Sequence, residues 1–167
     1  MDQISISIEE VKTKIKLAFI NVQFPGDENL LRSDSQDESE IEDFVNKDWQ
    51  KWQDIPLEII DYNNSSLCFF SPLALRFFLP AYLTYGLDHF ESNTLVFTIY
   101  KLIKPDELKL KEFFFSWVNQ LSFDQRFAIT LFLKYIKEQY DQIQCLPNEA
   151  EEALQSYWDK VETTTKT

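Results

Sequence analysis

Apolar residues recur every three or four positions along most of this chain, a spacing typical of helices that bury one face. Near the start, Ser7 and Glu10 form a capping-box pattern, and apolar residues then follow at helical spacing up to the sequence FPGDEN at residues 24–29. A second apolar stripe between Ile41 and Trp52 predicts another helix, whose opposite face is strongly acidic. The first third of the chain therefore favours a mainly α structure.

Two segments have patterns that fit more than one structure. Residues 57–70 (LEIIDYNNSSLCFF) fit either a short β-hairpin that turns at residues 63–66 or two helical fragments, and the sequence does not separate them. Residues 94–103 (TLVFTIYKLI) are rich in β-branched and aromatic types and suit a strand or a helix. We favour a helix at 94–103 because few other segments resemble strands that could pair with it.

The most apolar run of the chain, FFSPLALRFFLPAYL at residues 69–83, carries a single charge, Arg76. Ser71 is a good N-cap, and Pro72 suits the first helical position, where its missing N–H group costs nothing. A helix is therefore predicted to begin here, with Gly86 as its C-terminal stop.

The surrounding region, Leu67–Leu87, is long enough to span a bilayer. Its ten leucines and phenylalanines each favour insertion by about 0.3–0.6 kcal/mol, whereas the central arginine opposes insertion by about 2.5–3.5 kcal/mol and the two prolines add to that cost. The basic residues that orient membrane spans are absent between Lys51 and Arg76 and between Arg76 and Lys101. We therefore expect a buried helix and no membrane partner.

Three further helices are predicted in the C-terminal half. Residues 106–121 (DELKLKEFFFSWVNQL) read as one helix, and Ser122 with Gln125 opens the next with a second capping-box pattern. That helix is apolar nearly all round between residues 127 and 136, so we expect it at the centre of the core. The last apolar stripe lies within residues 150–161.

These patterns predict a single compact, mainly α domain of about six helices over residues 1–161, with the hairpin at 57–70 as its one optional β element. The polar sequence ETTTKT at residues 162–167 is expected to be a flexible tail. A composition of 44% hydrophobic and 16% aromatic residues supplies enough apolar area for one core.

The chain is strongly acidic, with 28 Asp and Glu against 16 Lys and Arg and a formal net charge of −12. Such a charge repels nucleic acid phosphates, so we expect no nucleic acid partner, and it favours a basic protein partner. Residues 27–54 hold 10 acids and 3 bases and so contribute −7 of the total. This run is either a solvated helix face preceded by a disordered loop or a docking surface for a basic partner.

The two cysteines, Cys68 and Cys145, belong to no paired spacing, so neither a disulfide framework nor a thiolate metal site is indicated. The N-terminal sequence lacks the basic start and apolar stretch of an export signal. We therefore expect a cytoplasmic protein. The sequence leaves its oligomeric state open.

Few kinds of catalysis are possible with this composition. Phosphate-binding and dinucleotide-binding loops need two or three closely spaced glycines, and this sequence has only Gly26 and Gly86, which lie far apart. The only histidine, His89, lies just past a predicted helix end, where an imidazole commonly bonds the last carbonyls. We expect no cofactor and no metal. The alternative is a small metal-dependent enzyme built from carboxylates and the histidine: Asp27, Glu28, Asp88, His89 and Glu91.

Arg76 requires a partner, because its neighbours at helical spacing are apolar and an unpaired buried charge is costly. We hypothesise that Asp27 of the FPGDEN loop pairs with Arg76 and locks the loop to the helix. The candidate binding residues on this hypothesis are Asp27, Glu28, Asn29, Arg76 and His89.

Four motifs in fixed order give the chain a family resemblance: FPGDEN, LCFFSPLALRFFLPAYL, LSFDQRFAITLFLKYI and EEALQSYW. With these motifs the chain resembles a bacterial family catalogued as domain of unknown function six-seven-one-four. The resemblance covers nearly the whole chain and implies a bacterial, single-domain, mainly helical protein, without a mechanism. Leu73 departs from expectation, because an acidic residue would suit that position near a helix N-terminus.

The absence of catalytic motifs and the acidic charge together favour a non-enzymatic binding protein. We expect a small acidic domain that covers a basic protein, in the manner of immunity proteins or antitoxins. The alternatives are the carboxylate enzyme described above and a structural subunit whose aromatic surface serves assembly.

Overall fold

The computed structural model describes residues 5–145 and 147–165, and the side chains of residues 5–145 and 147–161. The described chain is mainly α, as predicted, and its seven α-helices are α1 (Ile8–Phe19), α2 (Leu57–Tyr62), α3 (Pro72–Asp88), α4 (Asn93–Leu102), α5 (Leu108–Val118), α6 (Phe123–Gln142) and α7 (Glu149–Ser156). Five short 3-10 helices complete it: η1 (Asp27–Asn29), η2 (Glu38–Phe44), η3 (Trp52–Asp54), η4 (Ser66–Cys68) and η5 (Trp158–Thr165).

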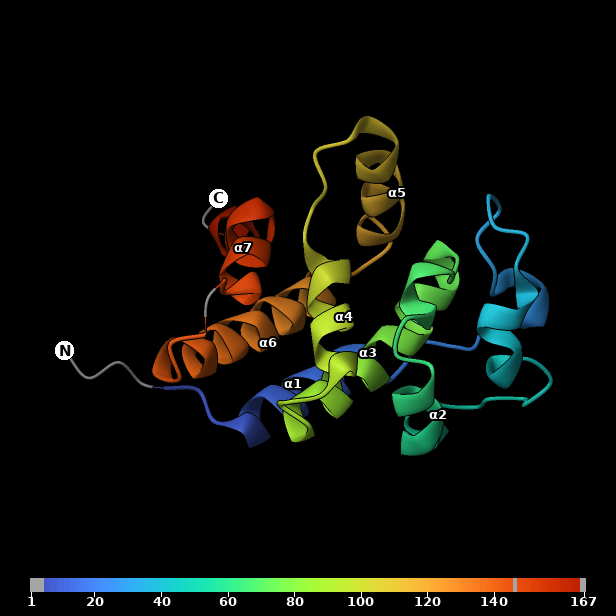
Figure 1. Ribbon diagram of the computed structural model, residues 1–167, viewed down its shortest axis with the longest axis horizontal. Helices are drawn as coiled ribbons and strands as arrows, with labels where there is room; N and C mark the ends of the chain where they lie inside the picture. Colours follow the sequence, from blue (N-terminus) through green and yellow to red (C-terminus); the bar gives the residue numbers. More distant parts are fainter. Residues whose placement is uncertain (1–4, 146, 166–167) are drawn as a thin grey trace.

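Helix α3 is the centre of the fold. It contacts α1, α2, α4, α5 and α6, and residues on all its faces are buried. Helix α6 packs between α1 and α7 and also contacts α3, and its residues 127–136 are all buried or half-buried, so it forms part of the core as predicted, although α3 contacts more of the other helices. Figure 1 shows α4 crossing α3 and α7 lying over α6. The segment between α1 and α2 lies at the right of this view, at the end of the molecule away from α6 and α7.

The three helix starts predicted from N-cap serines are confirmed. Ser7 with Glu10 and Ser122 with Gln125 both form complete capping boxes, and the side chain of Ser71 accepts a hydrogen bond from the Ala74 N–H group. These contacts join atoms within one helical turn, so local sequence determines them. Within the described residues, no helix has both the length and the apolar content needed to cross a membrane.

The prediction of Gly86 as a helix stop is wrong, because α3 continues through it to Asp88. A Cβ atom added at Gly86 would lie 2.8 Å from Cδ1 of Leu95 on α4. Gly86 is therefore explained by the close approach of α4, since a Cβ atom at this position would force the buried Leu95 side chain to move.

The predicted helix over residues 41–52 is also wrong. The chain forms η2, and then Asn46 and Asp48 adopt the left-handed region with φ of 59° and 50°. The apolar residues of this stripe are nevertheless used in packing: Phe44 is buried, and the Trp52 indole N–H donates to the Phe19 carbonyl at 3.3 Å. An irregular backbone places these aromatic rings in the core, and helix propensity is overridden.

Both ambiguous segments are helical. Residues 57–70 form the two fragments α2 and η4, so the optional hairpin is not present in the described chain, and residues 94–103 lie almost entirely in α4. The one β-type pairing among the described residues is an isolated antiparallel bridge between Leu31 and Phe70.

The last predicted helix is divided into two pieces. Helix α7 ends at Ser156, and η5 begins at Trp158, whose fully buried indole donates to the Leu102 carbonyl at 2.7 Å. This bond ties the end of the chain to α4. Of the expected tail, residues 162–165 continue the backbone of η5, and residues 166–167 lie outside the described part.

Candidate functional site

The FPGDEN loop docks onto the start of α3 through backbone hydrogen bonds. Gly26, with φ of 92°, turns the chain into η1, and Asn29 donates its side-chain amide to the Pro25 carbonyl at 2.9 Å. The Asn29 carbonyl accepts from the Ser71 hydroxyl, and the Ser71 N–H group donates to the Leu30 carbonyl at 2.7 Å. Loop and helix are thus fastened together, although not by the side chains that we predicted.

The hypothesis of an Arg76–Asp27 ion pair is wrong. Asp27 Oδ2 accepts from the Asn46 N–H group at 3.1 Å, and its other carboxylate oxygen is buried without a hydrogen-bond partner among the described residues. Asp27 therefore holds the chain where Asn46 takes its left-handed conformation. Glu28, beside it, is exposed to solvent.

Arg76 is partly buried, and its Nε donates to Gln125 Oε1 on α6 at 3.2 Å. Gln125 is almost fully buried and also donates its amide to the Ala18 carbonyl, at 3.1 Å, near the end of α1. Gln125 therefore links α1, α3 and α6. The two hydrogen bonds of this junction each join one part of the described chain to another.

His89 caps the other end of α3. Its Nδ1 lies 3.0 Å from the Tyr85 carbonyl, and its ring stacks on Tyr85 with centroids 3.9 Å apart. The predicted interaction of the histidine with the last helical carbonyls is thus confirmed. The neighbouring carboxylate, Asp88, forms an ion pair with Lys12, which raises the pKa of the lysine.

The residues of the carboxylate-enzyme hypothesis are not brought together. The loop with Asp27 and Glu28 is bonded to the first turn of α3, whereas Asp88 and His89 lie at its last turn. A helix of 17 residues spans about 25 Å at roughly 1.5 Å per residue. The described residues contain no group of three or more His, Cys, Asp or Glu side chains placed to hold a metal ion.

The acidic run at 27–54 presents its carboxylates to solvent on an anchored backbone. Seven of its ten acids are exposed: Glu28, Asp34, Asp37, Glu38, Glu42, Asp48 and Asp54. Within the described chain only Asp34 has a basic partner, Arg32 at 2.8 Å. The segment is fastened by the Ser66 hydroxyl, which donates to the Glu40 carbonyl at 2.7 Å, and by the buried rings of Phe44 and Trp52.

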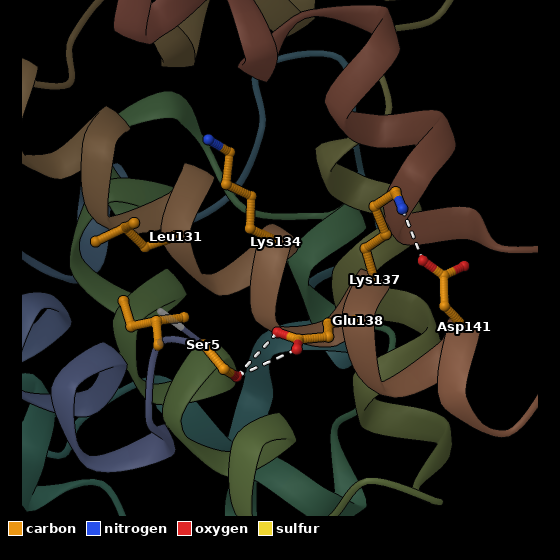
Figure 2. Close-up of a pocket in the computed structure, with 7 residues that line it drawn as sticks. Ser5, Leu131, Lys134, Lys137, Glu138 and Asp141 are labelled. Carbon is orange, nitrogen blue, oxygen red and sulfur yellow. Dashed lines mark hydrogen bonds and ion pairs between the residues drawn. The ribbon is translucent and has the colours of Figure 1, made fainter. Parts of the chain in front are cut away.

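A hollow of about 400 Å³ lies between Ser5 and Ile6 on one side and α6 on the other, and Figure 2 shows how its charges pair. The Ser5 hydroxyl donates to both carboxylate oxygens of Glu138, at 3.1 and 3.2 Å, and Lys137 pairs with Asp141 at 2.7 Å. Ser5 and Asp141 are exposed, Lys137 and Glu138 are half-buried, and these groups pair with one another. Among the described residues, the hollow therefore presents no fully buried charge of the kind that often marks a catalytic site.

A second hollow, which we did not predict, lies between α4 and α5. It has a volume of about 280 Å³ and is lined mainly by apolar side chains, five of them aromatic, with Arg32, Cys68 and Lys101 as its polar groups. The sequence signal that could have indicated it is Lys101, the one charge within the apolar stretch TLVFTIYKLI. Burial lowers the pKa of Lys101 to about 8.

No curated protein and no solved structure matches the chain. A match over residues 7–162 to the family of unknown function DUF6714 confirms the resemblance that the four sequence motifs indicated. The chain belongs to this family.

Proposed function

We propose that this chain is a non-enzymatic binding protein that docks a basic protein partner on the acidic segment of residues 27–54. The observation that carries the proposal is the exposure of acids that the chain itself leaves unpaired: seven are exposed, and one of the ten has a basic partner among the described residues. In the cell, such a protein would act in the cytoplasm by covering its partner, as immunity proteins and antitoxins do.

The anchoring of the segment supports this proposal. An acidic run that served only solubility would need no fixed backbone, whereas residues 38–54 bury Ile41, Phe44 and Trp52 in the core. Fixing the carboxylates before binding lowers the ordering entropy that association must overcome. Charges held in this way also steer a basic partner and increase its association rate.

Substitution of exposed acids tests the proposal. The variant Glu38→Gln, Glu42→Gln, Asp54→Asn removes three carboxylates that make no hydrogen bond or ion pair within the described chain. Each exposed charge pair with a partner is worth about 0.5–1 kcal/mol, so the affinity should fall roughly tenfold to a hundredfold.

A matched control removes the same charge elsewhere. Glu91→Gln, Asp106→Asn, Glu112→Gln changes three exposed acids outside the segment and gives the same net charge. The three proteins are used as bait in an extract of the native host, and the dissociation constant of the retained partner is then measured between low and high salt. Binding that is indifferent to salt, or that the control variant weakens equally, would contradict docking on this segment.

A further inference from the structure

The hollow between α4 and α5 contains two cations within an acidic protein. The Arg32 guanidinium carbon lies 3.7 Å from the centroid of the Phe113 ring, and Lys101 Nζ lies 4.7 Å from the same centroid. Two like charges beside one ring repel each other, and the low dielectric of a partly buried site strengthens that repulsion. Their proximity therefore requires compensation by negative charge.

Arg32 receives this compensation from its own chain. Its Nε and Nη2 donate to the two oxygens of Asp34, at 2.9 and 2.8 Å, and its Nη1 donates to the Cys68 carbonyl at 3.3 Å. The fork-shaped pairing lowers the pKa of Asp34. Both oxygens of Asp34 are thus directed at Arg32.

Lys101 is not compensated in this way. Its side chain is partly buried, and within the described residues no carboxylate lies within ion-pair distance of Nζ and no oxygen accepts a hydrogen bond from it. An ammonium group has three donors, and leaving them without acceptors in a partly buried position is costly. A ligand oxygen would supply the missing acceptor.

The walls of the hollow indicate what the oxygen is attached to. Five aromatic side chains line the space: Phe97, Tyr100, Phe113, Phe114 and Trp117. At its rim, Phe97, Tyr100 and Leu110 are 39%, 51% and 51% exposed, although phenylalanine and leucine are usually buried. Aromatic walls with a small number of convergent polar groups are characteristic of small-molecule sites.

We propose that the hollow between α4 and α5 binds a small aromatic carboxylic acid, with the carboxylate on Lys101 and the ring among Phe97, Tyr100 and Leu110. The volume of about 280 Å³ suits a ligand of one or two rings. A carboxylate would neutralise the positive charge left by Arg32, Lys101 and Asp34, and a ring would cover apolar surface that is now in contact with water.

Titration of the wild-type protein with matched acids and amides tests this proposal. Phenylacetate and indole-3-acetate are compared with phenylacetamide and indole-3-acetamide, which have the same shape without the charge, and binding is measured by calorimetry. We expect each acid to bind at least tenfold more tightly than its amide. Equal affinities, or no binding of either acid at millimolar concentration, would overturn the proposal, as would binding of an acidic peptide but of neither acid.

Variants then locate the charge. Lys101→Met should weaken acid binding at least tenfold and leave amide binding unchanged, whereas Lys101→Arg, which keeps the charge, should retain acid binding. Lys109→Met removes an exposed lysine from the neighbouring helix α5 and should have no effect. Loss of acid binding in Lys109→Met to the same degree as in Lys101→Met would show that net charge, and not the hollow, controls affinity.

The pH dependence provides an independent readout. With the pKa of Lys101 near 8, the affinity for an acid should be constant below pH 8 and fall up to tenfold per pH unit above it. The groups that face Lys101 are Arg32, Asp34 and Cys68, and Tyr100 lines the same hollow. The measurement is therefore repeated in Cys68→Ser, which replaces the thiol by a hydroxyl. An affinity that does not change between pH 7 and pH 10 would contradict the assignment to Lys101.

Discussion

Replacement of Gln125 by leucine should be among the most destabilising single changes on the surface of α6 that faces α1 and α3. Gln125 is 3% exposed, and its side chain accepts from the Ser122 N–H group at 3.1 Å and from Arg76 Nε at 3.2 Å. Its amide also donates to the Ala18 carbonyl at 3.1 Å. That carbonyl lies in the last turn of α1, where no N–H group of the helix is available to it.

The expected loss follows from these three contacts. The capping bond to Ser122 is worth about 1 kcal/mol and the charge-assisted bond from Arg76 about 1.5 kcal/mol. The carbonyl of the half-buried Ala18, left without this donor, adds about 1–2 kcal/mol. Gln125→Leu should therefore lower the free energy of unfolding by about 3–5 kcal/mol. Arg76→Met alone should cost about 1 kcal/mol, because the guanidinium is partly exposed and loses one bond.

Urea denaturation of the wild type, both single variants and the double variant measures these values. Because Arg76 and Gln125 share a hydrogen bond, their losses should not add, and the coupling energy should be about 0.5–1.5 kcal/mol. Gln120→Leu, an exposed glutamine just before the same helix, should change stability by less than about 0.5 kcal/mol. A loss below 1 kcal/mol for Gln125→Leu, or strict additivity with Arg76→Met, would refute the reasoning.

Four further predictions test other features of the fold. Gly86→Ala should destabilise the protein by about 1 kcal/mol, because its Cβ would lie 2.8 Å from Leu95 Cδ1. The loss should disappear when the same change is made in the Leu95→Val variant, and an equal loss in both backgrounds would contradict the close contact. Gln144→Gly should raise the melting temperature by about 2–4 °C, since Gln144 has a φ of 54° at the end of α6; no change would mean that the left-handed conformation costs nothing there. The hydrogen bond from Lys137 lowers the pKa of Asp141 from its usual 3.8, so this pair stabilises the folded state above about pH 4 and loses that effect as the pH falls through the folded pKa. The destabilisation caused by Asp141→Asn should therefore be present at pH 7 and decrease steadily as the pH falls below about 4; a destabilisation that does not change with pH would contradict the pairing. A chelator should leave the melting temperature of the protein unchanged, and metal analysis should find no stoichiometric ion, because the sequence has one histidine and two distant cysteines. A large fall in melting temperature in chelator would show that the protein needs a metal.

Local sequence was sufficient for the features that depend on one or two helical turns. The starts of α1, α3 and α6 were predicted correctly because each N-cap serine bonds an N–H group three residues away. The mainly α class followed from the apolar spacing, and His89 was placed correctly because its carbonyl partner belongs to the preceding turn. The excess of acids in residues 27–54 is a property of composition and needs no tertiary contact to be recognised.

Tertiary structure alone decided the features that join distant parts of the chain. Gly86 resembles a helix stop in sequence, and only the approach of α4 explains it. Arg76 meets Gln125, which is 49 positions away, because α3 and α6 pack together, and no local pattern distinguishes this amide from the carboxylate that we proposed. The helix expected at 41–52 is absent because burying Phe44 and Trp52 outweighs the small helix propensity of the acidic run. Likewise, the hollow beside Lys101 depends on α4 and α5 lying next to each other, a long-range arrangement that short-range periodicity does not encode.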